Sequence, residues 1–140
     1  MTFGGKIATA VSCVFEEMAF LETRYLGRGN FGGICFWGRI SILAPVPAEL
    51  FLAIPEEISR EIAAVVFNQG NTDDEAIGDL IGEFANIIAG RSLADEGDAI
   101  SLGTPTTGYG EVATHDNWEI FALDDERRFA VGWRLIGSVG

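Results

Sequence analysis

The chain has 140 residues, of which 48% are hydrophobic, and a formal net charge of −12 at pH 7. A chain of this size and composition can bury one sizeable core, which excludes intrinsic disorder and a fold that depends on disulfides or a structural metal. The excess of acidic residues leaves no basic surface to neutralise phosphates or anionic lipids, so nucleic acids and membrane surfaces are not expected partners.

The first half of the chain alternates between helical and extended patterns. Apolar residues at helical spacing predict an amphipathic helix over residues 6–22. The glycine-rich stretch 24–33 predicts a turn that separates this helix from the next element. Alternating apolar and polar residues then predict a half-buried strand over 34–42, and a second, short strand over 49–53.

Two more helices are expected in the middle of the chain. One runs over residues 55–67, where a proline suits the first turn and two glutamates suit the positive end of the helix dipole. The other runs over 73–89, because Thr72 and Glu75 have the spacing of a capping box and Gly90 is a suitable stop.

The last third of the chain has the pattern of a sheet. An acidic loop over 95–98 is followed by short predicted strands at 99–102, 110–113, 118–123 and 129–136. The last two strands are expected to form a hairpin with its charged tip at 124–126. The order of elements predicts an α+β fold, a two-layer sandwich with helices packed on one face of a mostly antiparallel sheet.

The helix over 73–89 carries a polar ridge opposite its apolar stripe. Asp79, Glu83 and Asn86 follow one another at i, i+4 and i+7, so they share one side of the helix. A helix side that merely faces solvent can carry such polar residues without any function, and that interpretation stays open. Asparagine is, however, a mediocre residue inside a helix, and here it lies in line with two carboxylates.

A row of small residues lies beside the ridge. It contains two glycines, Gly78 and Gly82, each of which costs a helix roughly 1 kcal/mol relative to alanine. Two explanations fit: another helix, such as the first one, packs closely along this row, or a partner protein approaches the ridge closely.

The same helix resembles a known motif. The segment from Asp79 to Asn86 has the form Asp-x-x-x-Glu-x-x-Asn and is similar to the helix of the CheC/CheX/FliY chemotaxis phosphatase family. The following apolar turn, the strand ending at Pro105 and the upstream order of elements also resemble that family. Only one Glu-x-x-Asn helix is present, so the resemblance is to CheX, with residues 1–140 as a single domain of this kind.

The resemblance implies hydrolysis of the aspartyl phosphate on a CheY-like response-regulator receiver. By this analogy Asn86 orients the attacking water and Glu83 anchors the receiver through its active-site lysine. Asp79 and Gly82 are expected to contact the partner. The chain itself would bind no cofactor, since the Mg²⁺ belongs to the receiver.

A non-catalytic module that only binds a response regulator, or acts as a switch, is the alternative. It predicts receiver binding with no effect on the lifetime of the aspartyl phosphate. A two-fold homodimer through exposed sheet edges is also expected.

The remaining chemistry-bearing residues indicate no second site. Cys13 and Cys35 lie in apolar stretches and are expected to be buried, reduced thiols. His115 is expected in a loop, and the acidic runs at 73–75 and 95–98 lack the ligand order of a calcium loop, so no metal site is predicted. With neither a signal peptide nor a long apolar run, the protein is expected to be cytoplasmic.

Overall fold

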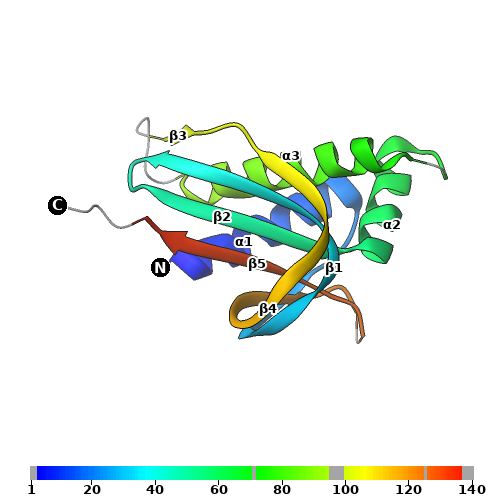
Figure 1. Cartoon of the computed structure of the whole chain (residues 1–140), viewed down its shortest axis with the longest axis horizontal. Helices are drawn as coiled ribbons and strands as arrows, with labels where there is room; N and C mark the ends of the chain where they lie inside the picture. The colour runs from blue at the N-terminus through cyan, green and yellow to red at the C-terminus, as the bar shows by residue number, and fades with distance from the viewer. Residues whose placement is uncertain (1–2, 71, 95–99, 125, 137–140) are drawn as a thin grey trace.

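Three helices cover one face of an antiparallel sheet in the part of the chain described by the computed structural model, residues 3–70, 72–94, 100–124 and 126–136 (Figure 1). The predicted α+β class and the two layers are therefore confirmed. The elements in chain order are α1 (Phe3–Ala19), β1 (Arg24–Ala44), β2 (Ala48–Pro55), α2 (Glu56–Phe67), α3 (Asp74–Ser92), β3 (Ser101–Leu102), β4 (Thr106–Ala122) and β5 (Arg128–Leu135).

The sheet is organised around β1. Its strand order is β2-β5-β4-β1-β3, and β1 pairs with β2 as well. Residues 24–39 of β1 pair with β4, residues 35–42 pair with β2, and the end of β1 pairs with β3. Because β2 also pairs with β5, and β5 with β4, these four strands form a closed circuit of hydrogen-bonded neighbours. The last hairpin, between β4 and β5, was predicted from the sequence and is confirmed.

The prediction of a turn over residues 24–33 was wrong, because these residues form the first half of β1. Gly27 and Gly33 have φ angles of 102° and 118°, and the pairing with β4 shifts register beside both. A glycine with positive φ inside a paired strand marks a β-bulge, which requires the same residues as a turn. The glycines therefore bend β1 instead of ending it.

The segments 110–113 and 118–123 were also expected to be separate strands, but they belong to the single strand β4. The backbone of His115, which was expected in a loop, lies within this strand opposite Phe31. Length is the reason for the error, since β4 has 17 residues and bends with β1. A strand of this length exceeds the usual range of three to ten residues or so.

The first helix ends earlier than predicted. α1 stops at Ala19 because Phe20 adopts a left-handed conformation with φ 56°, and the N–H of Leu21 then bonds the carbonyl of Phe15 at 3.1 Å. Glycine usually occupies the left-handed position at the end of a helix. The sequence carries no glycine there to signal the end.

The core lies between the helices and the sheet. Phe15 of α1 stacks on Phe129 of β5 at 4.5 Å between ring centroids and meets Phe84 of α3 edge-on at 5.4 Å. Phe36 of β1 and Phe121 of β4 are buried in the same cluster. These aromatic side chains fix α3 in position over the sheet.

Candidate functional site

The start of α3 is set by Asp73. Its side chain accepts a hydrogen bond from the backbone N–H of Ala76 at 2.8 Å, which satisfies one of the free donors of the first turn. Thr72, expected to cap this helix, lies one residue before the cap. Threonine and aspartate both suit this position, so their order along the chain does not decide between them.

The apolar stripe of α3 faces inward, as its spacing predicts. The residues of this stripe are at most 6% exposed: Ile77, Leu80, Ile81, Phe84 and Ile88. Because these side chains fix the rotation of the helix, the opposite ridge points away from the core.

The ridge is open to solvent. Asp79 and Glu83 are exposed and Asn86 is partly exposed. Among the described residues, none makes a hydrogen bond or ion pair with Glu83 or Asn86. With respect to the described part of the chain, both side chains therefore keep their hydrogen-bonding groups for a partner or for water.

The structure brings all four predicted site residues to one surface hollow of about 330 Å³, which we call the α3 depression. It is lined by Asp79, Gly82, Glu83, Asn86, Pro105 and Thr107. Thr107 was not expected in the site. It belongs to β4, and only the packing of α3 on the sheet brings it beside Gly82.

Gly82 is buried, and its backbone lies close to both β1 and β4. A Cβ atom at Gly82 would lie 2.5 Å from Thr107 Cγ2, and one at Gly38 of β1 would lie 3.0 Å from Gly82 Cα. At Gly78 a Cβ would meet Thr107 at an ordinary 3.6 Å. Of the two explanations for the glycines, packing within the fold accounts for Gly82, although the neighbour is the sheet and not another helix.

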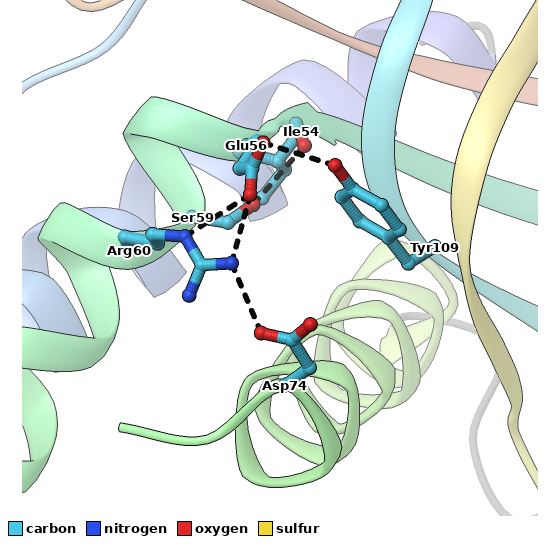
Figure 2. Close-up of polar contacts among 6 residues, drawn as sticks. All are labelled: Ile54, Glu56, Ser59, Arg60, Asp74 and Tyr109. Atoms are coloured by element: carbon cyan, nitrogen blue, oxygen red, sulfur yellow. Dashed lines mark hydrogen bonds and ion pairs between the residues drawn. The ribbon is translucent and has the colours of Figure 1, made fainter. Parts of the chain in front are cut away.

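A polar network ties the first turn of α3 to α2 and β4 (Figure 2). Arg60 of α2 donates to Glu56 at 2.8 and 3.2 Å and to Asp74 of α3 at 2.9 Å. Tyr109 of β4 donates to the second carboxylate oxygen of Glu56 at 3.0 Å. These partners lie up to 53 residues apart, so no local pattern in the sequence could have indicated the network.

The network sets the charge of its members. Hydrogen bonds from Arg60, then from Tyr109, lower the pKa of the Glu56 carboxyl, and the bond to that carboxylate raises the pKa of Tyr109. Its ion pairs are exposed, so each contributes little stability on its own. Their effect is to orient α3 beside β4 at the end of the strand that carries Thr107.

Neither cysteine lines the α3 depression. The described residues contain no cluster of three or more metal-ligating side chains, and the acidic loop 95–98 lies outside them. Cys35 is buried, which raises the pKa of its thiol to about 11, but Cys13 is exposed on α1, contrary to expectation. No described helix is long and apolar enough to cross a membrane.

Comparison with known proteins shows to which family the chain belongs. Residues 36–117, more than half of the chain and including the whole α3 depression, match the profile of the family described as chemotaxis phosphatase CheX. The chain belongs to the CheX family. The expectation drawn from the Glu-x-x-Asn helix is thereby confirmed at the level of the family. No match was found among curated protein sequences.

Solved structures of CheX proteins share the fold. CheX from Desulfovibrio desulfuricans is 16% identical, with a TM-score of 0.74 over 97% of this chain and 100% of that one. CheX from Vibrio vulnificus is 20% identical, with a TM-score of 0.73 over 96% of this chain and 97% of that one. CheX in the CheX–CheY–BeF3–Mg complex from Borrelia burgdorferi is 18% identical, with a TM-score of 0.69 over 95% of this chain and 98% of that one.

Proposed function

We propose that this CheX-family chain binds a phosphorylated CheY-like receiver at the α3 depression and accelerates hydrolysis of its aspartyl phosphate. One observation carries the proposal. Glu83 and Asn86 lie one turn apart on the outer side of α3, without internal partners among the described residues, at the rim of an open hollow. The complex of the Borrelia burgdorferi relative with CheY supports a receiver as the partner.

Asn86 is the residue we assign to the attacking water. Its carboxamide offers both a donor and an acceptor, so it can hold a water in line with the phosphorus without bringing a negative charge against the anionic phosphoryl group. Hydrolysis of this group requires positioning more than covalent chemistry, and the receiver supplies the Mg²⁺ and the phosphoryl group. A single neutral side chain on a rigid helix meets this requirement.

We assign Glu83 to anchoring the receiver. An exposed carboxylate one turn before Asn86 can pair with a lysine of the receiver through a charge-assisted hydrogen bond, which fixes how deeply the helix inserts. Asp79 lies seven residues before Asn86, about 10 Å along the helix axis, and is assigned to the rim of the contact. Gly82 is buried, and because it has no side chain it leaves the space between Asp79 and Asn86 open.

The test is phosphate release from a CheY-like receiver phosphorylated with acetyl phosphate. Asn86→Ala should lower the stimulation of hydrolysis by about 10²-fold, the scale on which positioning of a reactant acts, while binding to the beryllofluoride-loaded receiver is retained. Glu83→Ala should weaken that binding. Glu75→Ala, an exposed carboxylate two turns earlier, is the matched control and should change neither quantity.

The alternative of a non-catalytic binding module gives a different result. The unmodified chain would then bind the loaded receiver yet leave the lifetime of its aspartyl phosphate unchanged. Full stimulation by Asn86→Ala, in contrast, would refute the role of this residue while leaving the family assignment intact.

A further inference from the structure

A second hollow, of about 610 Å³, lies on the face of the sheet away from the helices. Along β1, Phe36 and Ile40 point into the core beneath the helices, so the alternating residues Trp37 and Arg39 point to the opposite face. We call this hollow the aromatic cleft. Its volume is typical of a small-molecule site, and it shares no residue with the α3 depression.

The floor of the cleft consists of aromatic rings that lie along the sheet. Trp37 stacks on Phe51 of β2 at 5.3 Å and 20°, and Phe51 meets Trp118 of β4 at 5.7 Å. Two glycines make this arrangement possible. A Cβ at Gly108 would overlap the Trp37 indole, and one at Gly132 would lie 3.2 Å from Trp118. The indoles therefore cover backbone and leave the space above them open.

One end of the cleft is cationic. Arg39 is exposed and has no ion-pair partner among the described residues, although the chain has 21 acidic residues against nine basic ones. Arg134 of β5 lies two strands away, where it contacts Glu49 at 3.2 Å. Glu49 neutralises part of that charge, so Arg39 is the guanidinium available to an anion.

The cleft extends along β4 from the position that pairs with Arg39 to Val112, whose side chain is buried beside Trp118. These positions are six residues apart, about 20 Å along the strand at about 3.3 Å per residue. A ligand in the cleft would meet a cation and then a row of ring faces.

We propose that the aromatic cleft binds a planar heteroaromatic ring that carries an anionic group, and that a purine nucleoside monophosphate represents this class. The base stacks on Trp37 and Phe51, because aromatic faces bind bases through their π-surfaces. The phosphate pairs with Arg39, whose planar fork suits phosphate oxygens.

The test is isothermal titration calorimetry of the full chain with AMP, adenosine and ribose 5-phosphate. AMP should bind saturably, and the two fragments should each bind at least tenfold more weakly. Arg39→Ala should weaken AMP binding by about tenfold. Arg128→Ala, which removes an exposed arginine elsewhere on the sheet, is the matched control and should leave binding unchanged.

Two further variants test the role of the aromatic floor and the independence of the aromatic cleft from the α3 depression. Phe51→Leu keeps an apolar side chain but removes a ring that stacks on the base, so AMP binding should weaken and approach that of ribose 5-phosphate. Glu83→Ala should leave AMP binding unaltered, whatever it does to receiver binding. Absence of saturable AMP binding at millimolar concentration, equal affinity of Arg39→Ala and the unmodified chain, or binding of ribose 5-phosphate as tight as that of AMP would each overturn the proposal.

Discussion

Gly82 illustrates how a single residue can serve both packing and access. Its missing side chain lets α3 approach β1 and β4 within van der Waals distance, and the same absence leaves the α3 depression open between Asp79 and Asn86. A glycine inside a helix costs about 1 kcal/mol relative to alanine. The close contact with the sheet offsets this cost.

Substitution of this glycine gives a prediction with an internal control. Gly82→Ala should lower the free energy of unfolding by about 1–3 kcal/mol, the usual cost of overpacking, because its Cβ would lie 2.5 Å from Thr107 Cγ2. Gly78→Ala has ordinary space and should be neutral or stabilising by up to about 1 kcal/mol. Urea denaturation measures both.

Removal of the opposing methyl group should reverse the effect. Thr107→Ser deletes Cγ2, so the double variant of Gly82→Ala with Thr107→Ser should regain a large part of the lost stability. If the two substitutions were simply additive, the contact between these residues would not be the cause.

The outward direction of Glu83 and Asn86 could be predicted from spacing alone, since the apolar stripe on the other side of α3 fixes the rotation of the helix. Thr107 and Tyr109 could not be predicted as neighbours of the site. They reach it only through the pairing of β4 with β1, a contact between residues about 70 positions apart in the sequence.

At the scale of elements, the cap of α3 provides a second prediction. Asp73→Ala should lower the free energy of unfolding by about 1 kcal/mol, because it removes the acceptor for the Ala76 N–H. Thr72→Ala should have little effect, since the Thr72 hydroxyl makes no hydrogen bond with the described residues. Thermal unfolding followed by circular dichroism distinguishes the two variants, and the reverse order would restore Thr72 as the cap.

The strands were harder to predict than the helices. An apolar stripe lies within one helix and can be found in sequence, as α2 and α3 illustrate. The stop predicted at Gly90 was wrong, because α3 continues to Ser92. The glycines of β1 carry an ambiguous signal, because a bulge and a turn both require positive φ. The long-range pairing with β4 decides between them, and it is not encoded in the local pattern.

At the scale of the whole molecule, the net charge of −12 predicts how the chain meets an acidic receiver. Long-range repulsion slows encounter between two acidic proteins, and added salt screens it over a Debye length of about 10 Å at 0.1 M. The association rate with a receiver of negative net charge should therefore rise with sodium chloride, as stopped-flow fluorescence can measure. A rate that falls with salt would indicate that local attraction at the α3 depression dominates.

The class of the fold could be predicted from the order of elements, since helices and strands that segregate along the chain form separate layers. The closed circuit of β1, β2, β5 and β4 could not, because it depends on β1 having two partners at once. The aromatic cleft, which lies on the face of these strands away from the helices, was missed for the same reason. Its tryptophans were expected in strands, but their common face was not.

Three consecutive residues of β1 join the two surfaces of the molecule. Gly38 supports Gly82 on the helical side, while its neighbours Trp37 and Arg39 project to the other side. A single strand thus forms the partition between the hollow that we assign to the receiver and the one that we assign to a nucleotide. Because even a Cβ atom at Gly38 would lie only 3.0 Å from Gly82 Cα, a displacement of this backbone toward α3 would have to move the helix that holds Asn86.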